Sequence, residues 1–102
     1  MVKHLRVQCP EINNILKTAK VQITFGGWSN RNAEYEYFWK KYKQGDIEKI
    51  FKNYFEYSEC EVEGDTCGFG FGSISFKLWD VKILKKDFDK LVDEIQEYIN
   101  NL

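Results

Sequence analysis

The sequence predicts a single α+β domain over residues 1–102: an antiparallel sheet, helices packed on one face of it, and a C-terminal helix. The chain has 102 residues, the size of one ordinary domain. Segments that alternate like strands are interspersed with segments of helical spacing, and short turns join the strand segments in the second half. Such turns favour antiparallel pairing, because parallel strands need long crossover connections.

The first 25 residues predict two strands and a helix between them. Residues 5–9 alternate apolar with polar side chains, and residues 21–25 alternate and are rich in β-formers, so both segments favour strands. Pro10 suits the first turn of a helix. The apolar residues that follow it at helical spacing are Ile12, Ile15, Leu16 and Ala19. We therefore expect a short helix from Pro10, and a loop over residues 28–32.

Residues 33–44 support two interpretations. Their aromatic side chains recur every three or four positions, as on one face of a helix, and Gly45 follows where such a helix would end. Yet Tyr35, Tyr37 and Trp39 also alternate as in a strand, and aromatic residues favour strands. The sequence leaves helix and strand open here.

The second half predicts a helix, a meander of strands and a terminal helix. Asp46 is a suitable N-cap for a helix over residues 47–57. Strands are expected over 58–63, 66–72 and 74–84, with a hairpin turn at Gly64-Asp65. Asp87 is placed to cap the final helix. The apolar stripe of that helix is formed by Phe88, Leu91, Val92, Ile95, Tyr98 and Ile99.

Residues 68–72 read Gly-Phe-Gly-Phe-Gly and lack the Gly-Lys-Ser/Thr of a phosphate-binding P-loop. In a strand, Phe69 and Phe71 would share one face and the glycines the other. A glycine face allows close approach by a backbone, a ring or a ligand, and we expect a helix or a tryptophan ring of this same chain there. The apolar alternation shifts near Gly72-Ser73, which predicts a bulge or turn.

Few residues are available for catalysis or metal binding. The single histidine, His4, supplies neither a catalytic pair nor a zinc ligand set, so we expect no enzyme and no cofactor. Three cysteines and no apolar leader predict reduced thiols in the cytoplasm, and no apolar run is long enough for a membrane span. Pairing of Cys60 with Cys67 stays open, although two small buried side chains are favoured.

The net charge of −1 conceals an uneven distribution. Residues 1–53 carry ten basic and five acidic side chains, whereas residues 54–102 carry five basic and eleven acidic ones. A charge split of this kind either marks an interaction surface or reflects basic and acidic elements that lie side by side in the fold. The sequence leaves both explanations open.

An acidic run with no lysine or arginine between Lys52 and Lys77 is the clearest functional signal. Its members are Glu56, Glu59, Glu61, Glu63 and Asp65. On a strand over 58–63, the three glutamates from Glu59 to Glu63 share one face and repel one another. A metal site would need a tighter mixed set of ligands. The remaining interpretations are a solvated face, pairing with lysines of the first half, and attraction of a basic partner.

The chain is small, its composition is rich in lysine, asparagine and isoleucine, and it carries the acidic run Glu59–Asp65 within a sequence rich in tryptophan and tyrosine. In these features the sequence resembles small bacterial toxin-immunity proteins, including those of contact-dependent growth inhibition. The resemblance is one of general character across the whole chain. It implies a non-catalytic cytoplasmic protein that binds and neutralises a cognate toxin, expected to be a basic protein such as a nuclease. The partner-binding residues would be Glu56, Glu59, Glu61, Glu63 and Asp65, with Trp28 and Trp79 as anchors.

The alternative is a nucleic-acid-binding module. Lysines at 40, 41, 43, 49 and 52 are interleaved with aromatic residues, a pattern found in proteins that bind nucleic acids. Core aromatics bordered by solvated lysines explain the pattern more simply, and the chain as a whole is slightly acidic, with a pI near 5.8. We therefore rank this alternative second. The sequence does not determine the oligomeric state.

Overall fold

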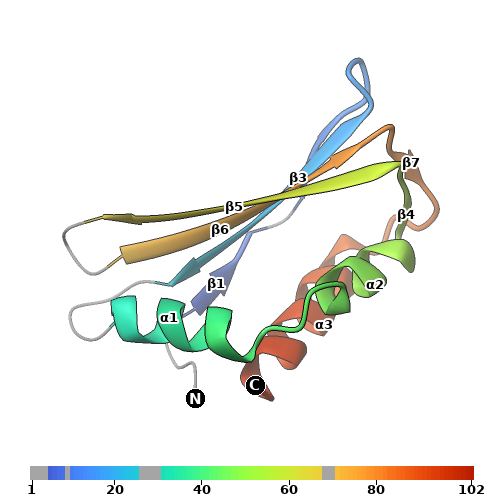
Figure 1. Cartoon of the computed structure of the whole chain (residues 1–102). Coiled ribbons are helices and arrows are strands. Elements are labelled where there is room, and N and C mark those ends of the chain that lie inside the picture. The colour runs from blue at the N-terminus through green and yellow to red at the C-terminus, as the bar shows by residue number, and fades with distance from the viewer. Residues whose placement is uncertain (1–4, 9, 26–30, 68–70) are drawn as a thin grey trace.

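The computed structural model describes residues 5–8, 10–25, 31–67 and 71–102, in which three helices lie on one face of an antiparallel sheet (Figure 1). The strands of this five-stranded sheet are β1 (Leu5–Val7), β2 (Glu11–Asn13), β3 (Thr18–Phe25), β5 (Glu59–Cys67) and β6 (Phe71–Trp79). Their order is β1-β3-β6-β5, and β2 also pairs with β3. The predicted α+β class is confirmed.

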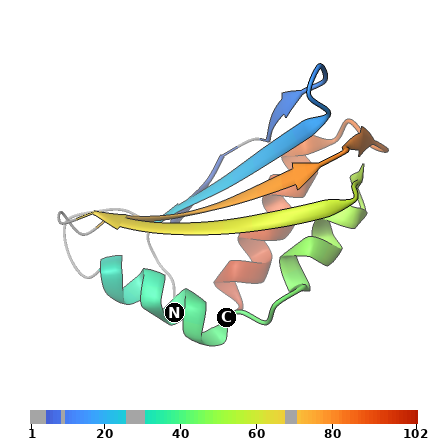
Figure 2. The same ribbon diagram turned by 45° about the horizontal axis from the view of Figure 1, so that its top comes forward.

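The helices are α1 (Arg31–Lys41), α2 (Asp46–Lys52) and α3 (Phe88–Asn100). A second, two-stranded sheet pairs β4 (Phe55–Glu56) with β7 (Lys82–Ile83). Figure 2 shows all three helices beneath the large sheet, and no helix of the described residues lies on its opposite face. The large sheet therefore has one covered face and one uncovered face.

Strand alternation sorts side chains between these two faces. Val21 of β3 lies opposite Phe76 of β6, Ile23 lies opposite Ile74, and all four are fully buried toward the helices. The helices contribute fully buried side chains as well: Phe38, Ile47, Phe51, Leu91, Ile95 and Ile99. Burying each large apolar side chain contributes about 1.5–3 kcal/mol, so this layer dominates the stability of the fold.

The uncovered face of the large sheet is mostly polar. From β3 it carries Lys20, Gln22 and Thr24, and from β6 it carries Ser73, Ser75 and Lys77, all of them half-buried or exposed. An antiparallel sheet packed on one side and solvated on the other is the usual origin of this pattern. The candidate functional site lies on this face.

Several predicted elements are confirmed. Strands occupy residues 5–7 and 21–25, and the C-terminal helix is present as α3. The ambiguous segment 33–44 is mostly helix, because α1 turns Phe38 into the core. Asp87 holds the N-cap position of α3 but makes no capping hydrogen bond through its side chain, which instead lies 3.7 Å from the Lys90 ammonium.

The predicted helix from Pro10 is wrong. The chain forms β2, then a turn over residues 14–17, then β3. The Asn13 side chain accepts hydrogen bonds from the backbone N–H groups of Ile15 (3.2 Å) and Leu16 (3.1 Å), a local arrangement that competes with helix formation. Ile15 is 92% exposed and Leu16 is 68% exposed, so the apolar spacing here does not mark a buried face.

The predicted turn at Gly64-Asp65 is also wrong, because both residues lie inside β5. The pairing of β5 with β6 runs without interruption from Glu59 opposite Trp79 to Cys67 opposite Phe71, so the chain reverses between Cys67 and Phe71. The same continuous pairing passes through residues 72 and 73, which excludes the expected bulge or turn there. Phe69 lies outside the described residues.

Two further boundaries differ from the prediction. The helix expected over residues 47–57 ends at Lys52, and Phe55 enters β4, since the backbone carbonyl of Tyr54 accepts hydrogen bonds from the Leu84 and Lys85 N–H groups. The strand expected over residues 74–84 ends at Trp79. Asp80, which follows it, has a φ of 53° and turns the chain toward β7.

Two glycines, one in β5 and one in β6, lie directly against aromatic rings of α1. For Gly72, the one glycine of residues 68–72 within the described ranges, the expected helix of the same chain is confirmed, but the ring against it is that of Tyr35 and not a tryptophan. A Cβ added at Gly72 would lie 2.7 Å from Tyr35 Cδ2 and 3.0 Å from Tyr35 Cβ. A Cβ added at Gly64 would contact the Tyr35 hydroxyl and the Trp39 ring. The absence of side chains at these two positions lets α1 approach the sheet closely.

Candidate functional site

The acidic side chains of β5 form a row on the uncovered face of the sheet. We define the acidic row as Glu59, Glu61, Glu63 and Asp65, all of which are exposed. Successive side chains of a strand point to opposite faces. The intervening Cys60 and Val62 therefore pack against the helix-covered core. Because β5 is the last strand in the sheet order, the row lies along an edge of the sheet.

The acidic row carries charge that no described residue neutralises through a close contact. In the described part of the chain, none of the four carboxylates has a lysine or arginine nitrogen within 4.0 Å; the ion pair found there joins Lys90 and Asp87. Lys77 of β6 is in register with Glu61, but its ammonium lies over the Trp79 ring, 4.2 Å from the centroid. Opposite Glu63 and Asp65, β6 carries serines.

Trp79 lies at one end of the acidic row. It is in register with Glu59, and its half-buried ring is on the same uncovered face. A flat aromatic ring supplies apolar contact area beside the carboxylates, and aromatic residues are enriched at protein-binding surfaces. The structure thus brings five of the predicted site residues together on one face.

The other two predicted site residues are not in this group. Glu56 is exposed, but it belongs to β4 and pairs with Lys82 of β7 in the small sheet. Glu56 is therefore separate from the acidic row, because β4 does not belong to the large sheet. Trp28 lies outside the described residues.

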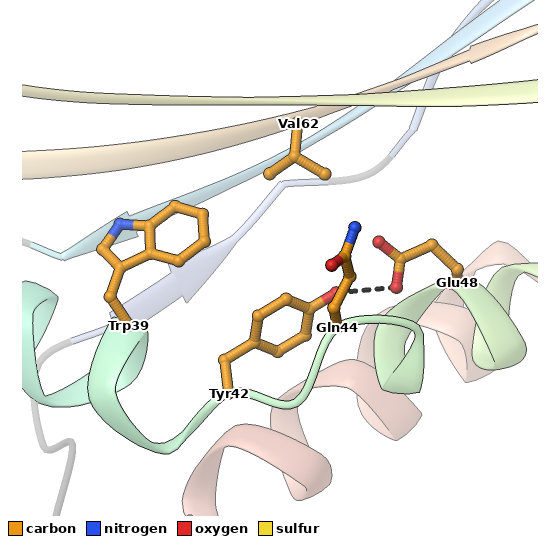
Figure 3. A pocket seen from close by; sticks show the side chains of 5 residues that line it. All are labelled: Trp39, Tyr42, Gln44, Glu48 and Val62. Atoms are coloured by element: carbon orange, nitrogen blue, oxygen red, sulfur yellow. Dashed lines mark hydrogen bonds between the residues drawn. The ribbon is translucent and has the colours of Figure 1, made fainter.

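A small cavity lies on the other side of β5, between the strand and the helices (Figure 3). Its volume is about 240 Å³, and its lining residues are Trp39, Tyr42, Gln44, Glu48 and Val62. Ligand pockets usually have volumes of about 300–1,000 Å³, so this cavity suits a single side chain better than a substrate. Sequence reasoning missed it, because it depends on α1 and α2 meeting β5.

Two polar side chains of this cavity, Tyr42 and Glu48, hold each other in place. The Tyr42 hydroxyl donates a hydrogen bond of 2.6 Å to Glu48 Oε2 (Figure 3). Burial and this hydrogen bond raise the pKa of Tyr42 far above its usual value, so the phenol stays protonated. Trp39 and Val62 supply the apolar part of the wall.

The lysines between residues 40 and 52 are exposed, whereas the aromatic rings between them belong to the core. Phe38 is fully buried and stacks on Tyr42 with 5.1 Å between ring centroids. Lys52 places its ammonium 3.8 Å from the centroid of the Tyr57 ring. This arrangement does not present a row of rings on which nucleic-acid bases stack.

The two cysteines of β5 do not pair. Cys60 is free, and Cys67 lies seven positions further along the extended strand, about 23 Å away at 3.3 Å per residue. A disulfide needs Cα atoms about 4.4–6.8 Å apart. Burial, above all, raises the pKa of the Cys60 thiol to about 12, so it is not a thiolate at neutral pH.

Within the described ranges, no group of three or more His, Cys, Asp and Glu side chains is arranged to hold a metal ion. No helix among the described residues is long and apolar enough to cross a membrane. Comparisons with protein-family models, curated proteins and solved structures found no match.

Proposed function

We propose that this chain is a cytoplasmic, non-catalytic binding protein that neutralises a basic partner protein, as an immunity protein neutralises a toxin. The observation that carries the proposal is the acidic row, which is exposed on the uncovered face of the sheet and has no close cationic partner in the described part of the chain. Trp79 adds an aromatic contact at the end of the row.

The physical basis is electrostatic complementarity. Carboxylates spaced two residues apart along one strand repel one another, and a cationic surface relieves that repulsion. The same field attracts a basic protein and raises its association rate. A nuclease is a suitable partner, because the cationic surface on which it binds phosphates would match a row of carboxylates.

The proposal is tested by capture of the partner from the lysate of the native cell at moderate salt. Three forms of the tagged chain serve as bait: the wild type, the row variant Glu59→Gln/Glu61→Gln/Glu63→Gln, and the control variant Asp89→Asn/Asp93→Asn/Glu97→Gln. The control changes the net charge equally, but at exposed positions of α3.

We expect the wild type and the control variant to retain one stoichiometric basic protein that the row variant loses. Mass spectrometry identifies that protein. Recovery of nucleic acid alone, released at higher salt, would contradict the proposal and favour the lysines between residues 40 and 52. Equal capture of the same protein by all three baits would remove the acidic row from the interface.

A further inference from the structure

The outer edge of β5 is open. The strand is nine residues long and pairs with β6 on one side only. No described segment forms backbone hydrogen bonds with its other side, and Figure 2 shows β5 as the outermost strand of the sheet. In an antiparallel strand, every second residue points its N–H and C=O groups to such an edge. These groups are a template for an added strand.

The two faces that meet at this edge differ in chemistry. The acidic row lies on the uncovered face, whereas Val62, between two glutamates in the sequence, points into the cavity with Trp39 and Tyr42 (Figure 3). A strand added at the edge would place alternate side chains beside the carboxylates and beneath the sheet near this cavity. An apolar cavity of about 150 Å³ holds a benzene molecule, so a cavity of about 240 Å³ is large enough for an aliphatic side chain.

We propose that the β5 edge binds an extended segment of the partner by strand addition, and that basic side chains alternate with apolar ones in this segment. The basic character of the segment rests on the proposed function, whereas the strand pairing rests on the open edge and the cavity. Backbone hydrogen bonds supply affinity in this mode, and alternate side chains supply specificity.

A second copy of this chain does not suit the same edge. Two β5 strands that paired edge to edge in one continuous sheet would bring their acidic rows together on one face. Like charges opposite each other across strands are destabilising. The acidic row therefore disfavours pairing of two β5 edges with each other, and it favours binding of a strand that carries positive charge.

The test uses a capped nine-residue peptide with lysine at odd positions and valine at even positions. A matched peptide of the same sequence carries a methyl group on every backbone amide nitrogen, so it retains the charge and side chains but cannot donate hydrogen bonds to a strand. Binding is measured by NMR titration of the whole chain, together with hydrogen exchange of its backbone amides.

We expect the first peptide to bind, and the methylated peptide to bind at least tenfold more weakly. At saturation with the first peptide, exchange of alternate amides of β5 should slow at least tenfold. Amides of β1, at the opposite edge of the sheet, should not change. The row variant should bind the first peptide at least fivefold more weakly.

Any different outcome shows which part of the proposal is wrong, the strand pairing or the basic character of the segment. Absence of binding up to millimolar peptide would overturn strand addition. A second outcome would also overturn strand addition: the two peptides bind equally, the row variant binds both more weakly, and the β5 amides are not protected. This outcome would leave the acidic row as the attractive surface. Protection of β5 with unchanged affinity in the row variant would retain the edge and contradict the basic character of the segment, and with it the proposed function.

Discussion

Replacing Gly72 with alanine is expected to lower the free energy of unfolding by about 1–3 kcal/mol. Gly72 is buried in β6, and an added Cβ would lie 2.7 Å from Tyr35 Cδ2 and 2.9 Å from Tyr35 Cγ. Cγ is bonded to Cβ and lies close to the backbone of α1, so a small rotation of the Tyr35 side chain hardly moves it, and the helix itself would have to shift. Urea unfolding followed by tryptophan fluorescence or circular dichroism measures the loss, which is large for a domain of about 5–15 kcal/mol total stability.

Two variants show whether Tyr35 is the cause. Gly64→Ala should cost less, since its nearest contact is the Tyr35 hydroxyl, the far end of a side chain that can swing away. In a Tyr35→Ala background, where Cγ and Cδ2 are absent, Gly72→Ala should lose most of its effect. An equal cost of Gly72→Ala in both backgrounds would show that Tyr35 does not set the requirement for glycine.

The row variant Glu59→Gln/Glu61→Gln/Glu63→Gln is expected to weaken binding of the captured partner by about 1–3 kcal/mol, or about 5- to 150-fold at low salt. An exposed charge pair contributes about 0.2–1 kcal/mol, and three are removed. Most of the loss should lie in the association rate, because these charges act at long range. Surface plasmon resonance at two salt concentrations measures both rate constants.

The α3 variant Asp89→Asn/Asp93→Asn/Glu97→Gln is the matched control for this loss. It should change the association rate much less, although its net charge is the same. At about 0.5 M salt, screening should bring the wild type and the row variant close together. If both triple variants slowed association equally, overall charge rather than the acidic row would be responsible.

The sequence pattern predicted the parts of the fold in which buried residues recur with the period of a single strand or helix. The alternation over Val21–Phe25 predicted the strand that is part of β3, and the apolar stripe from Phe88 to Ile99 predicted the helix α3. The same alternation placed Glu59, Glu61 and Glu63 on one face, and their positions in β5 confirm that shared face.

The remaining predictions failed where distant contacts decide the structure. Gly64 resembles a turn residue, yet it lies in β5 and makes room for Tyr35 and Trp39, which precede it by 29 and 25 residues. Ile15 and Leu16 have helical spacing but are exposed at a turn that the Asn13 side chain stabilises. Neither effect is visible in the periodicity of a short segment.

The cavity beside β5 could not be predicted for the same reason. Its lining residues come from α1, the segment that follows it, α2 and β5. The sequence left residues 33–44 open between helix and strand, so the direction of Trp39 and Tyr42 was undetermined. Only the packing of α1 against the sheet brings these rings to Val62.

The most direct test of the central claim is carboxyl footprinting of the complex. Exposed carboxylates of the free chain and of the chain with its captured partner are modified by a carbodiimide and an amine, and labelling at each position is measured by mass spectrometry. We predict that labelling of Glu59, Glu61, Glu63 and Asp65 falls strongly on binding, while labelling of Asp89 and Asp93 on α3 is unchanged. Unchanged labelling of the acidic row, with protection of α3 instead, would contradict the account.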